Sequence, residues 1–272
     1  MQTFRYVIAK TELEIMDAQR VRHAVYVEEE GLLPASVGVG GREIDGLDYL
    51  DTTVHFLVYA GLEPVGTVRL LRGGPSSPAA AEGKRLGLDI ESKLNLDSLA
   101  VPGVVTGEVT RFCVRRRYRR TGVTGALFAG LRDESARLGI THWVAGANME
   151  TDCAEDAVLA YRLAFEKNLI NPRFSAEPRD RRFPRTPRRR PYYNEEQRRR
   201  GMDGELTGLE LPRTLSLFAA GMGARFIGPP VFDAYFDIFA LPLVAALADI
   251  PAQRARSTER RTPARLEAEA RP

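Results

Sequence analysis

A carboxylate and a guanidinium, Glu108 and Arg111, lie within one strongly apolar segment, residues 104–114. The alternation in this segment predicts a buried strand, and buried charges are costly unless they have a partner or a task. Two roles stay open: a general base at Glu108, or a Glu–Arg ion pair that joins strands. Because the two residues are three apart, a regular strand would place them on opposite faces, and a β-bulge between them would change that.

A basic turn follows this segment directly, with five arginines between residues 115 and 120, and leads into a predicted helix over residues 122–138. The free backbone N–H groups at a helix N-terminus, with arginines beside them, suit an anion such as a phosphate. Five arginines cannot all reach one phosphate, so we expect one or two to bind it. The others form either a basic rim that attracts an acidic carrier protein or a solvated run of charge.

Length and composition exclude several classes of protein. A chain of 272 residues, 44% of them hydrophobic, can form one large domain or two small ones. Its two cysteines and three histidines lack the spacing of a disulfide framework or a metal site, so no metal is expected. The N-terminus is interpreted as a strand rather than a signal peptide, and no apolar run is long enough to span a membrane, so a cytoplasmic location is expected.

Periodicity and turn signals place the elements that would hold these residues. Strands are predicted over residues 4–9, 55–59, 65–71, 104–114, 141–147, 224–227 and 231–239. Helices are predicted over residues 11–30, 122–138, 152–168 and 212–223, with a capping box at Thr11 and Glu14 and a cap formed by Asp152 and Glu155. The remaining stretches are interpreted as loops over residues 34–51, 73–83 and 171–200, and as a disordered tail over residues 251–272.

Residues 173–200 carry most of the uneven charge, with eleven arginines against four acidic residues. The segment has no clear periodicity and is interpreted as an exposed insertion. Its arginines fit docking of a carrier protein or contact with an anionic membrane surface. Nucleic acid is not expected, because the interleaved aromatic residues lack the platform pattern of an RNA-binding sheet.

Several of these residues carry a resemblance to a known family. The order of the elements, and the turn Arg119-Arg120-Thr121-Gly122-Val123-Thr124, resemble the GNAT acyltransferase fold and its pyrophosphate loop. A series of N-terminal residues resembles the acyl-homoserine-lactone (autoinducer) synthases and two related groups, the long-chain N-acyl amino acid synthases and the exosortase-associated acyltransferases. The matching residues are Arg22, Tyr26, Glu43, Asp45, Asp48, Arg69, Glu108 and Arg111.

The resemblance implies an α/β, GNAT-like fold with a central mixed β-sheet flanked by helices. It also implies one acyltransferase domain over residues 1–250 with an Arg-rich insertion at about 149–210. Glu108 would be the catalytic base, beside an opening in the sheet that admits the pantetheine arm. The amine acceptor would be bound by Arg22, Tyr26, Asp45, Asp48, Arg69 and Arg111, and the phosphopantetheine by Arg119, Arg120, Gly122, Thr124 and Gly125.

The expected reaction is transfer of a fatty acyl group from an acyl carrier protein thioester to the amino group of an amino acid or a derivative, giving a signal lipid. Attack is expected to be direct, because no activated serine or cysteine is evident. No cofactor is expected beyond acyl-ACP or acyl-CoA as co-substrate. The absence of the tryptophan that lactone synthases have after their first helix favours the amino acid synthase branch. An acyl-homoserine-lactone synthase, an acyl-CoA-dependent N-acetyltransferase and a non-enzymatic acyl-binding module remain alternatives.

Overall fold

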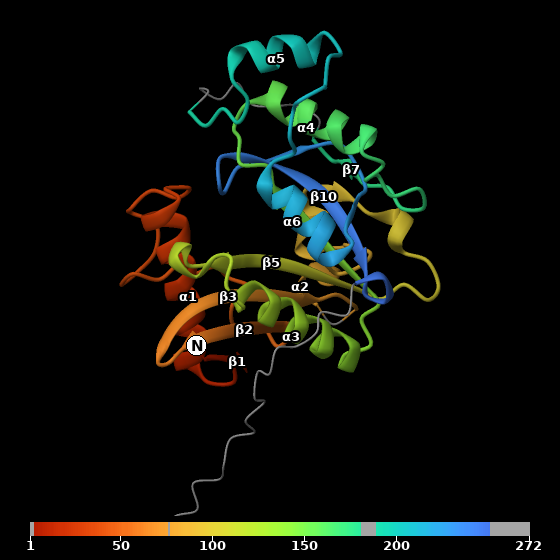
Figure 1. The fold of residues 1–272 in the computed structure, drawn as a ribbon. Helices are drawn as coiled ribbons and strands as arrows, with labels where there is room; N and C mark the ends of the chain where they lie inside the picture. The colour runs from red at the N-terminus through yellow and green to blue at the C-terminus, as the bar shows by residue number, and fades with distance from the viewer. Residues whose placement is uncertain (1–2, 76, 181–188, 251–272) are drawn as a thin grey trace, which may run out of the picture.

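The computed structural model describes residues 3–75, 77–180 and 189–250. An eight-stranded mixed sheet forms its centre, in the order β1-β2-β3-β5-β6-β10-β8, with β9 paired to β10 (Figure 1). The predicted α/β fold with helices flanking a mixed sheet is confirmed. Among the described residues, no helix is long and apolar enough to cross a membrane. The prediction of a disordered tail over residues 251–272 lies outside the described residues.

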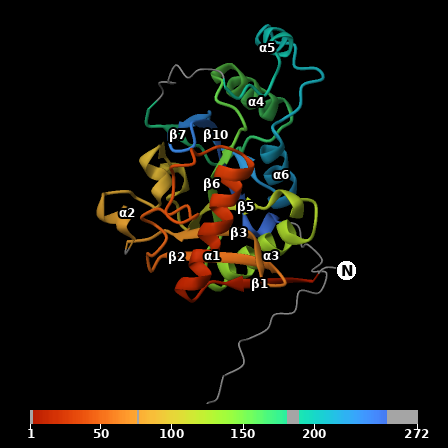
Figure 2. The ribbon, with the colours of Figure 1, turned by 90° about the vertical axis from the view of Figure 1, so that its left-hand side faces the viewer.

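The N-terminal half forms an antiparallel sheet covered by helices on both faces. Its strands are β1 (Phe4–Ile8), β2 (Thr53–Ala60) and β3 (Glu63–Arg72). Helix α1 (Glu12–His23) begins with the predicted capping box, since Glu14 N donates to Thr11 Oγ1 at 3.3 Å and Thr11 N donates to the Glu14 carboxylate at 3.1 Å. The helix continues as a π-helix over Ala24–Glu29, and Gly31, with φ +56°, ends it. Figure 2 shows α1 lying across one face of this part of the sheet.

The central elements are the long strand β5 (Thr106–Val114), helix α3 (Val123–Arg137) and strand β6 (His142–Asn148). Helix α3 buries the predicted stripe of Val123, Leu127 and Leu131 against the face of β2 and β3 opposite α1. Its N-terminus therefore stands directly after β5, where the basic turn ends.

The C-terminal half extends the sheet beyond β6 and adds three helices above it (Figure 1). The helices are α4 (Ala154–Glu166), α5 (Glu195–Met202) and α6 (Arg213–Met222). The strands are β8 (Arg225–Phe226), β9 (Val231–Asp233) and β10 (Ile238–Ala246). The shorter elements of the described residues are α2 (Pro78–Ala81), β4 (Leu94–Asn95), β7 (Glu177–Pro178) and four 3-10 helices, Asp89–Ser92, Asp97–Leu99, Arg116–Tyr118 and Leu247–Asp249. As predicted, α6 follows Pro212 and ends at Gly223, which has φ +61°.

Four predictions about this fold were wrong. The cap of α4 is Cys153, without a side-chain bond, because Asp152 instead binds the backbone of the insertion. The last long strand starts at Ile238 because Asp237, with φ +54°, makes a turn after β9. Helix α2 lies within the predicted 73–83 loop. Segment 171–200 contains β7 and α5, and the latter begins with a capping box at Asn194.

Candidate active site

A β-bulge in β5 brings Glu108 and Arg111 to the same face of the sheet, as the spacing of the two residues required. In the pairing with β3, Thr110 lies opposite Arg69 but Cys113 lies opposite Thr67, so β5 carries an extra residue between these pairs. Arg111 has φ +56°, which is rare for a residue with a side chain and marks the bulge.

Phe112, which follows the bulge, points to the opposite face, where it bridges β5 to two helices. Its ring stacks on Phe128 of α3 with centroids 5.0 Å apart and meets Phe218 of α6 edge-on at 5.8 Å. These three phenylalanines therefore cover the α3 face of β5 beside the bulge.

Strands β5 and β6 separate immediately after Glu108. They pair in parallel only at three positions, of which Glu108 opposite Val144 is the last. Beyond it, β5 stays paired with β3 up to Val114, and β6 stays paired with β10 up to Asn148. Strands β5 and β6 therefore diverge where the opening in the sheet was expected; we call this divergence the split, and Glu108 stands at its closed end.

Glu108 is a buried carboxylate, 4% exposed, whose Oε2 accepts a hydrogen bond from Ile90 N at 3.0 Å. Burial raises its pKa to about 7, with a further increase from Asp89, while the Ile90 N–H and Arg69 pull the pKa down. A carboxyl group with this pKa can accept a proton at neutral pH. The alternative of a Glu108–Arg111 ion pair is wrong, because Arg111 binds Glu43 and Asp45 instead.

Three arginines and three carboxylates form one closed ionic cluster on the same face as Glu108. Arg22 from α1 pairs with Asp48 at 2.6 Å and with Glu43 at 2.6 Å. Arg69 from β3 pairs with Asp48 at 2.8 Å and with Asp45 at 2.6 Å, and Arg111 completes the cluster through Glu43 and Asp45. The loop over residues 34–51 is thereby attached to α1, β3 and β5.

The members of the ionic cluster differ in exposure. Arg22, Glu43, Asp48 and Arg69 are buried, at 1% exposed or less, so they hold the loop in place. Burial alone would raise the pKa of Asp48, but its hydrogen bond with Arg22 and the charges of Arg22 and Arg69 together outweigh burial and leave the pKa well below its usual range. Arg111 and Asp45, with side chains 14% and 18% exposed, are the members that reach the surface.

Two aromatic residues of the β9–β10 turn complete the site and were not predicted. Tyr235 donates its hydroxyl to Glu43 Oε1 at 2.6 Å, and its ring lies 5.0 Å from the Arg111 guanidinium. Phe236 lies 5.3 Å from the same guanidinium and 4.8 Å from Tyr26 of the π-helix. Tyr26 is thus held in an apolar cluster with Cys113, rather than at the surface.

Replacing Tyr235 with phenylalanine is expected to lower the affinity for the amine acceptor several-fold and the unfolding free energy by about 1 kcal/mol. The variant keeps the ring over Arg111 but removes one hydrogen bond to a charged group. Steady-state kinetics and urea denaturation measure the two effects, with Tyr161→Phe on α4 as the control. Unchanged KM values in Tyr235→Phe would show that this hydroxyl has no part in the acceptor site.

The predicted phosphate loop lies directly before α3, as expected, but most of its arginines are engaged in ion pairs. Gly122 caps α3 without a side-chain bond, and Arg120 is exposed with φ +65°. Arg119, however, pairs with Glu30 at 2.8 Å, and Arg115 pairs with Glu29 at 2.7 Å. Arg117 pairs with Glu63. Among the described residues, Arg120 has no ion pair, so the predicted basic rim is largely neutralised.

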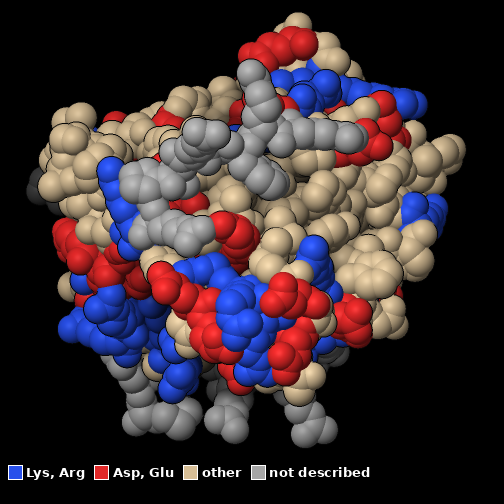
Figure 3. All heavy atoms as spheres, turned by 90° about the horizontal axis from the view of Figure 1, so that it is seen from above, with Lys and Arg blue, Asp and Glu red and all other residues tan. Residues whose placement is uncertain are grey.

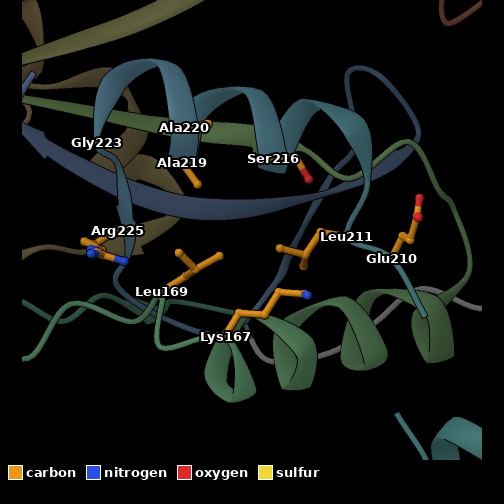
Figure 4. Close-up of a pocket in the computed structure, with 9 residues that line it drawn as sticks. All are labelled: Lys167, Leu169, Glu210, Leu211, Ser216, Ala219, Ala220, Gly223 and Arg225. Atoms are coloured by element: carbon orange, nitrogen blue, oxygen red, sulfur yellow. The ribbon is translucent and has the colours of Figure 1, made fainter. Parts of the chain in front are cut away.

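Two cavities lie away from Glu108. The larger, of about 600 Å³, lies between α4 and α6 (Figure 4) and is lined by Lys167, Leu169, Glu210, Leu211, Ser216, Ala219, Ala220, Gly223 and Arg225. The other, of about 550 Å³, is lined by Glu150, Tyr192, Tyr193, Gln197, Gly208, Glu210 and Arg213. Neither is lined by Glu108 or by the ionic cluster, so neither is the expected thioester channel.

The Arg-rich insertion is only partly the exposed segment that was predicted. Phe174, Ala176 and Tyr193 are buried, and so is Arg198, which pairs with the buried Asp156 of α4 at 3.3 Å. Arg199 and Arg200 pair with glutamates. Figure 3 shows acidic side chains beside the basic ones on the described part of the face that is seen from above.

One family model matches part of this chain. Residues 21–129 match the acetyltransferase (GNAT) domain family, a range that includes β2, β3, β5 and the start of α3. A comparison with curated proteins gave no match. The match covers 109 of the 272 residues, in the part of the chain that holds β5 and the basic turn.

Solved structures with a similar fold are distant in sequence. FeeM, an N-acyl amino acid synthase from uncultured soil microbes, is 12% identical, with 92% of this chain and 93% of that chain covered and a TM-score of 0.49. BjaI, a CoA-dependent acyl-homoserine lactone synthase, is 16% identical, with 91% and 84% covered and a TM-score of 0.46. A putative N-acetyltransferase from Lactobacillus plantarum is 14% identical, with 90% and 99% covered and a TM-score of 0.44.

Proposed function

We propose that this chain, which matches the acetyltransferase (GNAT) domain family over residues 21–129, transfers a fatty acyl group from an acyl carrier protein thioester to the amino group of an amino acid or a derivative. One observation carries the proposal: a buried carboxylate with a pKa of about 7, Glu108, stands where β5 and β6 separate. A thioester that enters the split would place its carbonyl beside this carboxylate.

In the proposed reaction the amine nitrogen attacks the thioester carbon, the N–C bond forms and the C–S bond breaks. Glu108 takes the proton from the nitrogen and passes it to the departing sulfur, so that the pantetheine leaves as the thiol and the carboxylate is regenerated. An α-ammonium group has a pKa of about 8, so a base of this strength suffices at neutral pH. Direct attack is favoured because Cys113 and Cys153 are buried, and burial raises the pKa of their thiols to about 12 and about 11.

The ionic cluster supports an acceptor that carries both charges of an amino acid. Arg111 would meet the carboxylate and Asp45 would meet the ammonium group, because these two side chains reach the surface. Arg22, Arg69 and Asp48 would act by holding Arg111 and Asp45 in place. Tyr26 would support the same site through its contact with Phe236.

The charge of the phosphate loop supports a carrier protein as the donor. The loop offers the N-terminus of α3, with Gly122, Thr124 and Gly125, and one arginine without an ion pair among the described residues, Arg120. This is enough for the single phosphodiester of a phosphopantetheine arm, whereas coenzyme A brings additional phosphates. Release of Arg119 from Glu30 would add a second cation. The acyl chain would pass beside Phe112 and Phe218, which must shift to admit it.

Turnover with a panel of donors and acceptors tests this proposal. The purified chain is incubated with acyl carrier protein loaded with acyl groups from acetyl to palmitoyl, or with the matching acyl-CoA thioesters, and with amino acids. Mass spectrometry is expected to find N-acyl amino acids, formed fastest from long-chain acyl carrier protein. An acyl-homoserine lactone as the main product, or acetylated amines formed only from acetyl-CoA, would replace the proposal with one of its alternatives.

A further inference from the structure

The insertion reaches across the molecule to the end of the π-helix. The guanidinium of Arg190 donates from Nη1 to Glu30 O at 3.0 Å and from Nη2 to Gly31 O. Gly31 has φ +56°, and a β-carbon added there would lie 3.5 Å from Arg190 Nη2. The chain thus turns at Gly31 in a backbone conformation that favours glycine, and this turn presents two adjacent carbonyls to one guanidinium.

Arg190 is anchored on its other side to the end of β6. The carboxylate of Asp152, 2% exposed, accepts hydrogen bonds from the backbone N–H of Arg190 at 3.0 Å and of Arg189 at 2.8 Å. The adjoining backbone is fixed by the neighbouring strand, since Phe239 N donates to Thr151 O at 2.8 Å. Asp152 therefore ties the insertion to the β6 side of the split.

The end of the π-helix is tied in turn to the end of β5. Glu29 accepts from Arg115 Nε at 2.7 Å and from Arg116 N at 2.7 Å, directly after Val114. A continuous series of contacts therefore runs from β6 through Asp152 and Arg190 to Glu29 and then to β5. It connects the two strands beyond Glu108 and Val144, the last positions at which they pair.

We propose that this series, Asp152–Arg190–Gly31 with Glu29–Arg115, is a clasp that holds the open end of the β5–β6 split at a fixed width and limits entry of water, so that Arg190 is a positioning residue for acyl transfer. The effect of the clasp on acyl transfer rests on the proposed function, whereas the contacts that form the clasp do not. The clasp assigns a task to one arginine of the 173–200 segment that carrier-protein docking did not explain.

The clasp has a chemical consequence because a thioester beside a base can react with water as well as with an amine. In that side reaction water attacks the thioester carbon and the C–S bond breaks. Glu108 takes a proton from the water and passes it to the departing sulfur, and the products are a fatty acid and the thiol. A split of fixed width keeps the carbonyl at one distance from the base and leaves less room for water. Loosening the clasp should therefore favour hydrolysis over amine transfer.

The test compares Arg190→Ala and Arg190→Lys with Arg189→Ala, whose backbone N–H stays in the clasp while its exposed side chain is removed. Hydrogen exchange is measured on the amides of residues 29–33 and 189–193, together with donor hydrolysis in the absence of acceptor. Arg190→Ala is expected to speed exchange at least tenfold in both segments. It is also expected to raise the ratio of hydrolysis to transfer at least fivefold, with Arg190→Lys in between and Arg189→Ala unchanged.

The two readouts separate the clasp from the proposed function. Unchanged exchange in Arg190→Ala would overturn the clasp even if the chain is an active acyltransferase. Faster exchange without a change in the hydrolysis ratio would overturn its role in positioning. Faster exchange in a chain that transfers no acyl group from any donor would leave the contact series standing and refute the proposed function.

Discussion

Replacing Glu108 with glutamine is expected to lower kcat for acyl transfer by about 10²–10⁴-fold while the affinity for the acyl donor stays within twofold. Glutamine keeps the shape of the side chain and can still accept the hydrogen bond from Ile90 N, but it cannot take a proton. Single-turnover kinetics with acyl carrier protein thioesters measure the chemical step, and equilibrium binding measures the donor affinity. Glu134→Gln, which changes a carboxylate that pairs with Arg137 on α3, is the matched control.

The same variant is expected to be more stable than the wild type at neutral pH. Burial raises the pKa of Glu108 from its ordinary value of 4.5 to about 7, so the folded state disfavours the ionised form. Ionising the buried carboxyl group lowers the unfolding free energy of the wild type. This loss is absent below about pH 4.5, grows as the pH rises, and reaches its full value of about 3 kcal/mol above about pH 7. Urea denaturation of Glu108→Gln should therefore show a stability gain that appears between these pH values. A stability loss at pH 8 would mean that the carboxylate is structural.

Replacing Asp48 with asparagine is expected to lower the unfolding free energy by about 3–5 kcal/mol, the largest stability effect in the ionic cluster. The change leaves the buried guanidiniums of Arg22 and Arg69 without the carboxylate that they share at 2.6 Å and 2.8 Å. It should also release the 34–51 loop and with it the acceptor site, so that acyl transfer falls together with stability. Asp51→Asn, at an exposed position of the same stretch, should change neither by much.

The pH dependence of the Asp48 contribution has the opposite sign from that of Glu108. The pKa of Asp48 is lowered in the folded state, so its contribution is present above its ordinary value of 3.8 and is lost as the pH falls towards the folded-state pKa. The difference between wild type and Asp48→Asn should therefore be constant from pH 5 to 8 and shrink only in stronger acid. A difference below about 1 kcal/mol at pH 7 would contradict a structural role for the cluster.

The sequence was most informative at Glu108 and Arg111, where the alternation of a regular strand conflicts with the expectation that both side chains serve one site. Glu108 and Arg111 on a regular strand would have faced apart, and the structure resolves this conflict with the bulge at Arg111. The capping box at Thr11 and the α3 stripe were predictable because both depend on neighbours within one helix. The acidic residues of the 34–51 loop could be grouped with the arginines only through the resemblance, because their partners lie on α1, β3 and β5.

The parts that could not be predicted depend on contacts between distant segments. Tyr235 and Glu43 form a hydrogen bond although they are 192 residues apart in the sequence. The turn that holds Tyr235 had been predicted as part of a continuous strand over residues 231–239. Asp152 looked like a helix cap because nothing local shows that its carboxylate binds the backbone of Arg189 and Arg190 instead. The ion pair between Arg119 and Glu30 could not be predicted for the same reason, because a run of arginines does not show which acidic residues lie near it in the fold.

The most direct test of the central claim is the ratio of kcat/KM between wild type and Glu108→Gln, measured for acyl transfer from pH 5 to 9. Ionisation of the amine affects both proteins equally, so the ratio isolates the protonation of Glu108. The account predicts a large, constant ratio above about pH 8 that falls by about tenfold per pH unit below the Glu108 pKa of about 7. A ratio near one at every pH would show that Glu108 accepts no proton in the reaction.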